Sequence, residues 1–420
     1  MLKFEPPQLE TDFRNAIAQL TDQMSVLVGG EDLNRDFDLE LFDDEEWTAS
    51  SEVKLEFPRS DTDAELSIGD LIELTAEVTD PKTSFDGLVY HSSVRTVIRA
   101  QSWDLRSISF AEKAGAESSL GAAVDTEIGG RPASVGLRGI SPHYAAIIVL
   151  RDHFWDKYNP PVQVDDVWIE VTHELGADKD AAIAVIQAYL FELHASLGVE
   201  YSESPRPTTG DVEYPEDEEI SDLILKAEKL RPLLLGQGLP TLLQEFNRGY
   251  GPQNSEAALL CYVKCIEYVA TTVVRERQYE DLRKRLLSRE ALNPNADYLE
   301  GLLRLVEENR VFTRDAEALK LSVERCCDSV PMAPHAPKYL RRLAAVSAQS
   351  GLEDRKSALS DLADALTATR NQLAHAKANY KSTGKECPPE QIDSLVACAK
   401  LAAEQCIRWY AARSPELRRG

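Results

Sequence analysis

The stretch LSDLADALTATRNQLAHAKANY, residues 359–380, combines a clear helical pattern with the only arrangement of side chains in the chain that indicates chemistry. Arg370, Asn371 and His375 stand near its end. Its leucines recur at near-heptad spacing, which predicts one buried helical face. These leucines are Leu359, Leu362, Leu366 and Leu373, and Thr369 interrupts their apolar run.

The sequence around this stretch repeats the helical pattern and predicts an all-helical half of the chain at 219–420. We expect the longest helix, at 253–289, to bury a stripe that begins at Leu259 and Tyr262 and continues through Ile266 and Val269. The predicted helices cover 219–232, 239–249, 253–289, 296–308, 312–328, 337–349, 352–381 and 389–412.

Residues 1–200 carry a different pattern, in which strand signals are frequent. Alternating or β-branched residues at 53–57, 71–78, 88–90 and 94–100 predict an antiparallel sheet or small barrel with one solvated face. Periodicity predicts helices at 8–27, 143–158 and 178–197, while 167–171 fits a strand or a helix start. Composition predicts loops at 31–47 and 115–133. The alternative for the acidic run 31–47 is a nucleic-acid mimic or an autoinhibitory arm. The fold class is therefore α+β, with Trp155 and Trp168 as anchors of this half.

Charge separates the same two halves. Residues 221–420 hold 30 Lys and Arg against 26 Asp and Glu, a net charge of +4. Because the whole chain has a net charge of −25, residues 1–220 carry a net charge of −29. The acidic half should repel nucleic acid, whereas the second half can bind it locally. A proline-containing acidic segment lies between them and reads as a linker. We predict an acidic regulatory or sensor region at 1–200, a linker at 201–218 and a helical domain at 219–420.

Composition is that of a globular protein, with 43% hydrophobic residues and no signal peptide at the first residues. No apolar run reaches the length of a membrane span, so we expect a cytoplasmic protein without membrane contact. All seven cysteines follow residue 260, and their spacing lacks the paired knuckles of a zinc site. We expect reduced, mostly buried thiols, no metal and no cofactor.

The side chains near residue 370 suit phosphate chemistry. An arginine grips phosphate through its planar fork, and a histidine passes protons near neutral pH. RNA supplies its own nucleophile, the 2′-hydroxyl, so Arg370 and His375 form a sufficient set for cutting RNA without metal. Asn371 can orient the phosphate or the imidazole.

Helix geometry constrains how Arg370 and His375 can reach the same groove. At about 100° per residue, Asn371 and His375 lie about 40° apart on the helix, whereas Arg370 and His375 lie about 140° apart. Arg370 falls at the edge of the leucine stripe, where it must extend its head group toward water if the stripe packs within one subunit. A homodimer that duplicates the motif across a two-fold axis would bring the two side chains to one groove.

The pattern Arg370-Asn371-x-x-x-His375, late in an all-helical region, resembles the Arg-x(4–6)-His signature of the HEPN superfamily, and most closely its bacterial abortive-infection and antiphage members. The resemblance covers residues 219–412. It implies a dimeric helical bundle with a composite cleft and metal-independent endoribonuclease activity, in which Arg370 binds phosphate, His375 acts as general base or acid, and Asn371 is the polar residue beside the arginine. In this family an acidic residue on an earlier helix often supports the site, and Glu267 is the candidate here.

The chain departs from the family in two respects. Some HEPN toxins carry a tyrosine two residues after the histidine, where a partner nucleotidyltransferase modifies it, but this position is Lys377. A nucleotidyltransferase antitoxin is therefore not supported. The helical region is also longer than a minimal HEPN domain.

Other motifs are weaker. The sequence His173-Glu174 begins like a zinc-protease helix but lacks the second histidine. Asp165, Asp166 and Glu170 resemble an acidic metal site, yet no lysine follows at the spacing that such nucleases use.

Two functions follow from these observations. The first is a metal-independent endoribonuclease of bacterial antiphage defence or toxin type, acting on RNA as a homodimer, with a protein or phage-derived trigger at its acidic half. The alternative is a non-catalytic helical dimerisation or adaptor protein that binds a protein partner through that half.

Overall fold

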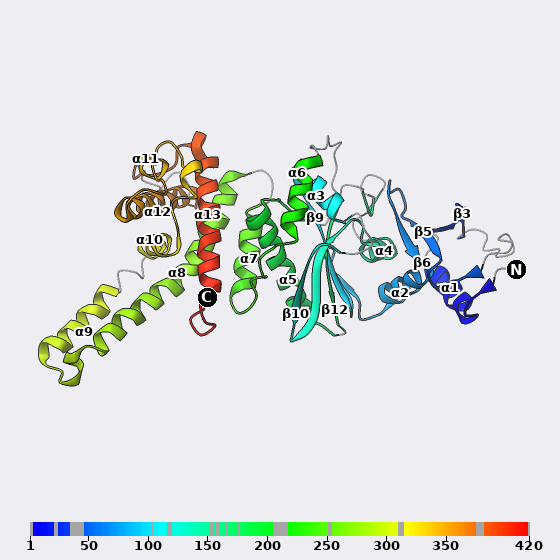
Figure 1. Ribbon diagram of the computed structural model, residues 1–420, viewed down its shortest axis with the longest axis horizontal. Helices are drawn as coiled ribbons and strands as arrows, with labels where there is room; N and C mark the ends of the chain where they lie inside the picture. The colour runs from blue at the N-terminus through cyan, green and yellow to red at the C-terminus, as the bar shows by residue number, and fades with distance from the viewer. Residues whose placement is uncertain are drawn as a thin grey trace. The chain divides into compact units, whose positions relative to one another are not determined.

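The computed structural model describes residues 3–20, 24–33, 46–102, 104–115, 120–151, 155–156, 160–163, 166–174, 176–204, 217–250, 254–309, 315–374 and 382–418. These residues form two compact units, 1–233 and 234–420. The predicted α+β class is confirmed, because antiparallel sheets between residues 25 and 173 precede a mostly helical region (Figure 1).

The first unit begins with a small antiparallel sheet of order β3-β2-β5-β6 and two helices that pack on each other. Its core collects apolar side chains from both layers, including Phe13, Leu55 and Leu71. The bounds are β1 Lys3–Phe4, α1 Gln8–Gln19, β2 Ser25–Val28, β3 Glu31–Asp32, β4 Glu46–Trp47, β5 Glu52–Glu56, β6 Asp63–Ser67 and α2 Ile68–Thr79; β1 pairs with β4.

A larger antiparallel sheet follows, of order β10-β11-β12-β9-β8-β7, with β13 paired to β9. Helices α3 and α5 pack against it, α4 contacts α2, and α6 packs on α3 and the π-helical turn η2. The bounds are β7 Ser84–Phe85, β8 Val89–His91, β9 Arg95–Gln101, α3 Leu105–Gly115, β10 Gly121–Ile128, β11 Arg131–Arg138, α4 Pro142–Leu150, β12 Val167–His173, α5 Lys179–Glu192, η2 Leu193–Leu197, β13 Ser202–Glu203 and α6 Asp217–Ala227.

The predicted strand at 71–78 is wrong, because this segment forms most of helix α2. Its Ile, Thr and Val residues favour strands, but its buried residues recur at three- and four-residue steps: Ile68, Leu71, Leu74, Thr75 and Val78. A capping box also starts the helix, since Asp70 N donates to Ser67 Oγ at 3.0 Å and Ser67 N donates to Asp70 Oδ2 at 3.3 Å. The helical period and the cap together outweigh strand propensity.

The predicted loop at 115–133 is also wrong, because β10 and β11 form a hairpin there. Ile128 pairs with Arg131 across Gly129 and Gly130, whose φ angles are 60° and 76°. Two-residue hairpin turns need positive φ at both positions, and glycine adopts it without a steric cost. The Gly-Gly pair was therefore the hairpin signal within a segment that looked like a loop by composition.

Three predicted helices are shorter than expected. The helix predicted at 143–158 corresponds to α4, which ends at Leu150. The helix predicted at 8–27 ends at Gln19, and β2 begins at Ser25, so Met24 enters the core from outside a helix. The helix predicted at 337–349 is limited to α11, which spans Arg341–Ala344 between turns. The open assignment at 167–171 is a strand, β12, with Trp168 fully buried.

The second unit is a bundle in which α8, α10, α12 and α13 pack on one another, while α7 and α9 pack on α8. The predicted stripe on α8 is confirmed, since Leu259, Tyr262, Ile266 and Val269 are all buried. The bounds are α7 Leu239–Arg248, α8 Ser255–Leu286, α9 Ala296–Asn309, α10 Asp315–Cys326, α11 Arg341–Ala344, α12 Leu352–Ala374 and α13 Ile392–Ala411.

The predicted linker at 201–218 lies mostly outside the described residues, so the predicted domain boundaries stay predictions. Helix α6 was assigned to the helical half from the sequence, but it packs on α3 and η2 of the first unit. The division between the two compact units falls after Leu233.

Candidate functional site

Three of the four predicted site residues meet between α8 and α12 of the second unit. Arg370, in the last described turn of α12, places its Nη2 atom 3.2 Å from both carboxylate oxygens of Glu267 on α8. Its Nη1 atom donates to the side-chain oxygen of Asn371 at 3.0 Å. Two acceptors therefore orient one guanidinium. His375, the fourth residue, lies outside the described residues.

The leucine stripe of α12 explains this placement. Leu359, Leu362 and Leu366 are buried within the unit against α8 and α10. Arg370 stands at the edge of that buried face, with about a third of its side chain exposed. An arginine at such an edge can keep its stem in the core and its head group near water, and here the head group meets Glu267.

A small cavity of about 230 Å³ adjoins this pair. Its wall adds a residue that the sequence did not single out, Asp315 at the start of α10. Burial raises the pKa of Glu267 and the charge of Asp315 adds to this rise, while the Arg370 guanidinium opposes it. No local signal marks Asp315, because α10 brings it to the site from another part of the chain.

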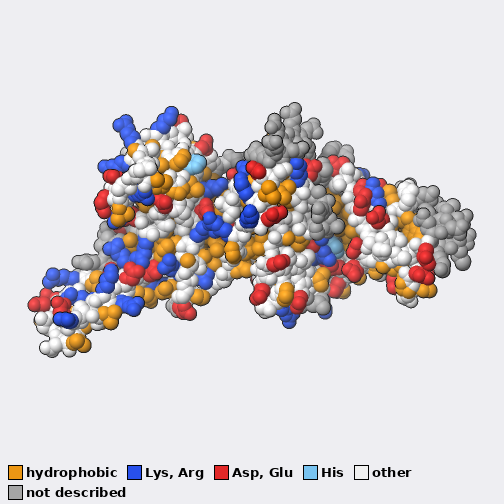
Figure 2. Space-filling model, in the orientation of Figure 1, with side chains coloured by type: hydrophobic (Ala, Val, Ile, Leu, Met, Phe, Trp, Pro, Cys, Tyr) orange, Lys and Arg blue, Asp and Glu red, His pale blue; other side chains and the backbone are white. Residues whose placement is uncertain are grey.

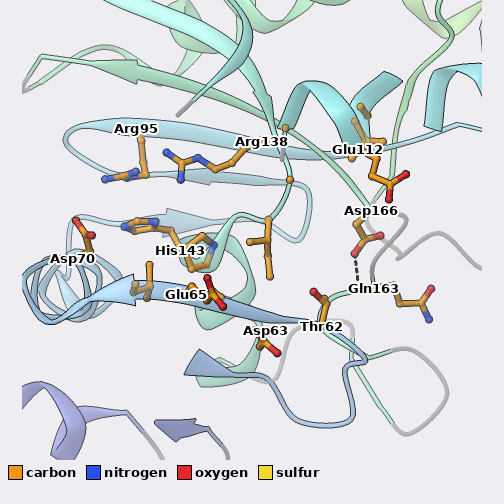
Figure 3. Close-up of a pocket in the computed structure, with 18 of the residues that line it drawn as sticks. Thr62, Asp63, Glu65, Asp70, Arg95, Glu112, Arg138, His143, Gln163 and Asp166 are labelled. Atoms are coloured by element: carbon orange, nitrogen blue, oxygen red, sulfur yellow. Dashed lines mark hydrogen bonds between the residues drawn. The ribbon is translucent and has the colours of Figure 1, made fainter. Parts of the chain in front are cut away.

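A larger cavity, of about 600 Å³, lies in the first unit (Figure 3). Strand β6 and helix α2 line one part of it. Strands β9 and β11, helix α3, the start of α4 and the residues Gln163, Asp166 and Val167 before and at the start of β12 line the rest. Figure 3 shows Arg95 and Arg138 on one side, Glu65 and Asp63 on the opposite side, and His143 between them.

A buried charge network holds the two arginines of this cavity. Glu170 on β12 is fully buried, and its two oxygens lie 3.0 Å from Arg95 Nη1 and 3.0 Å from Arg138 Nε. Glu77 on α2 accepts hydrogen bonds from Arg95 Nε at 2.9 Å and from the hydroxyls of Tyr90 and Ser92. The network links the small sheet's helix to the large sheet, and it uses the carboxylate of Glu170 for structure.

His143, the second residue of α4, is more than nine-tenths buried at the wall of this cavity. Neither ring nitrogen makes a hydrogen bond with the described residues, and Nε2 lies 3.5 Å from Glu77 Oε2. Burial, helped by the charges of Arg95 and Arg138, lowers the pKa of His143 well below its ordinary value. The imidazole is therefore neutral at pH 7.

This pKa has a consequence for stability. Since the folded pKa of His143 is lowered, the unfolded chain binds one proton more than the folded chain below about pH 6.5, so acid weakens the fold. Glu77, Arg95, Arg138 and Tyr90 face the ring. When the pH is lowered from 6.5 to 5.5, we expect the unfolding free energy of His143→Gln to fall by about 1 kcal/mol less than that of wild type. Urea unfolding at both pH values measures this, and equal losses in wild type and variant would contradict it.

Among the described residues, no group of three or more His, Cys, Asp or Glu is placed to hold a metal ion. All seven cysteines are free thiols, and the Sγ atoms of Cys327 and Cys406 lie 3.8 Å apart. By length and composition α8 could cross a membrane, although more than half of its most apolar window is buried in the unit.

Comparison of the whole chain with protein-family models, curated proteins and solved structures finds no match.

Proposed function

We propose that this protein is a metal-independent endoribonuclease of the HEPN type, with its active site at the end of α12. The observation that carries the proposal is the contact of Arg370 with Glu267 and Asn371 at a half-buried cavity. An arginine oriented in this way offers its remaining N–H groups to a phosphate without the entropy cost of a free side chain.

The charges of the cavity wall limit how strongly Arg370 alone can bind a phosphate. The cavity wall carries two carboxylates, Glu267 and Asp315, against the single guanidinium of Arg370. A phosphate therefore needs further positive charge. Two lysines that follow His375 in the sequence, Lys377 and Lys381, can supply this positive charge. The helical pattern of the sequence predicts roughly 140° between Arg370 and His375, and this expectation further supports a site completed by a second copy of the chain.

In the proposed reaction His375 takes the proton from a ribose 2′-hydroxyl, and the 2′-oxygen forms a bond to phosphorus. The bond from phosphorus to the 5′-oxygen of the next nucleotide breaks, and that oxygen receives a proton from the His375 of the second copy. Arg370 stabilises the charge that develops on the phosphate oxygens. The products are a 2′,3′-cyclic phosphate and a 5′-hydroxyl.

The test is incubation of the purified full chain with total RNA in EDTA. We expect cleavage to persist in EDTA, with cyclic phosphate ends, and His375→Ala to slow it about a hundredfold because the general base is lost. Gln372→Ala, which changes an exposed neighbour on the same helix, is the matched control and should cleave like wild type. Loss of cleavage in EDTA would contradict the metal-free route, and unchanged cleavage by His375→Ala would remove it from the site.

A second candidate function is a non-catalytic dimerisation or adaptor protein, and one observation favours it. Apolar side chains are exposed along the end of α8, the turn after it and α9, interspersed with basic ones (Figure 2). Apolar surface of this kind marks interaction sites. The exposed residues are Leu286, Leu287, Leu292, Leu299 and Leu303.

The adaptor function predicts different results. RNA stays intact in every assay, and Leu292→Glu lowers the assembly mass measured by light scattering, because a charge replaces the most exposed of these leucines. A matched change of a charged neighbour, Arg304→Glu, should leave the mass unchanged. An unchanged mass for Leu292→Glu would remove this surface from the assembly.

A further inference from the structure

The inner wall of the cavity in the first unit carries Arg95, Arg138 and the buried His143. Among the described residues Arg138 meets one charged group, Glu170, whose Oε2 atom lies 3.0 Å from Nε without forming a hydrogen bond. Both nitrogens of the buried His143 likewise lack a hydrogen bond. Buried polar groups in folded proteins are nearly always satisfied, so a buried imidazole that lines a cavity without a hydrogen bond indicates a missing partner.

The charges of this wall favour an anionic acceptor. Arg95 and Arg138 line the cavity, whereas their carboxylate partners Glu77 and Glu170 do not. A guanidinium recognises a carboxylate through paired N–H groups, and a neutral imidazole can add one donor. The inner wall is thus suited to one carboxylate of a ligand.

The rest of the lining is acidic. Glu65 on β6, Glu73 on α2 and Glu112 on α3 line the cavity and are all exposed, and Asp63, Asp70 and Asp166 line it as well. These carboxylates repel a second anionic group and attract a cation. A polyphosphate or a nucleic acid would meet this repulsion, whereas an ammonium group would not.

We propose that this cavity binds a small zwitterion of the amino-acid or dipeptide class. Its carboxylate lies on Arg95, Arg138 and His143, and its ammonium group lies among Glu65, Glu73 and Glu112. The volume of about 600 Å³ falls within the range of sites for small molecules. This site lies wholly in the first unit and is independent of the ribonuclease proposal.

The experiment measures the thermal unfolding of the full chain with each of the free amino acids and a series of Gly-Xaa dipeptides at 5 mM, followed by calorimetric titration of the strongest. We expect at least one zwitterion to raise the unfolding temperature by several degrees. Its C-terminal amide and its N-acetyl derivative should each bind at least tenfold more weakly, because each lacks one of the two charges.

Variants locate the binding. Arg138→Gln should weaken it at least tenfold, and Glu112→Gln, at an exposed position, should weaken it severalfold without harm to the fold. Glu127→Gln, on the exposed part of β10 and outside the cavity, is the control and should bind like wild type. The proposal is overturned if no member of the series binds, if the amide or inorganic phosphate binds as tightly as the zwitterion, or if Arg138→Gln and Glu112→Gln bind normally.

Discussion

Arg370→Ala should reduce RNA cleavage about a thousandfold, since an arginine that stabilises a transferring phosphate contributes effects of this size. The loss corresponds to about 4 kcal/mol of transition-state stabilisation. Arg370→Lys should recover only a small part, because a lysine keeps the charge but cannot contact Glu267, Asn371 and a phosphate through one planar fork. Initial rates on a defined RNA in EDTA measure both variants.

A loss of stability in Arg370→Ala would also lower the measured cleavage rate, but the structure indicates that this loss is small. The ion pair of Arg370 with Glu267 is about one-third exposed on each side, and such pairs contribute at most about 1 kcal/mol. Glu267→Gln tests the orienting role separately, since it keeps the shape and one acceptor, and it should slow cleavage less than Arg370→Ala. Equal cleavage by wild type and Arg370→Ala would end the assignment of this site.

Glu170→Ala should destabilise the first unit by about 3–5 kcal/mol, because it removes the only fully buried carboxylate shared by two arginines of the network. Arg95 would keep its contact with Glu77, but Arg138 would lose its one charged partner among the described residues. Breaking one partner of a buried ionic network leaves uncompensated charge in a poorly hydrated site.

Urea unfolding followed by tryptophan fluorescence reports mainly on this unit, since four of the five tryptophans lie within residues 1–233 and only Trp409 lies in the second unit. The control Glu127→Ala changes an exposed glutamate of the same sheet and should shift unfolding by less than about 0.5 kcal/mol. Glu170→Gln should fall between the two, because an amide still accepts a hydrogen bond. A Glu170→Ala protein that unfolds at the wild-type midpoint would show that the network is not a major source of stability.

Periodic apolar patterns predicted the helical half well. The buried stripe of α8 and the leucines of α12 follow directly from spacing, since a helix repeats every 3.6 residues. The strand predicted at 71–78 and the loop predicted at 115–133 are wrong, because the helical period of α2 outweighs strand propensity and the Gly129-Gly130 turn outweighs loop-like composition. Both signals were present in the sequence.

The two candidate sites differ in how much of each can be predicted from the sequence. The contact of Glu267 with Arg370 joins the arginine of the motif to the acidic residue that the family resemblance suggested as its support, and the catalytic roles remain a proposal. The cavity of the first unit had no sequence signal, because Arg95, Arg138 and His143 come from β9, β11 and α4. Each looks like an ordinary surface or core residue until the sheet places it beside the others.

The sequence by itself determined the α+β class, the charge contrast of the halves and the helix that carries Arg370, because these depend on local period and composition. Only the tertiary structure decided that Glu170 is a buried structural carboxylate, that Asp315 joins the Arg370 cavity, and that His143 faces a cavity without a hydrogen bond. The reason is physical. Burial, pairing and the pKa of a group depend on neighbours from distant segments, and no local pattern contains them.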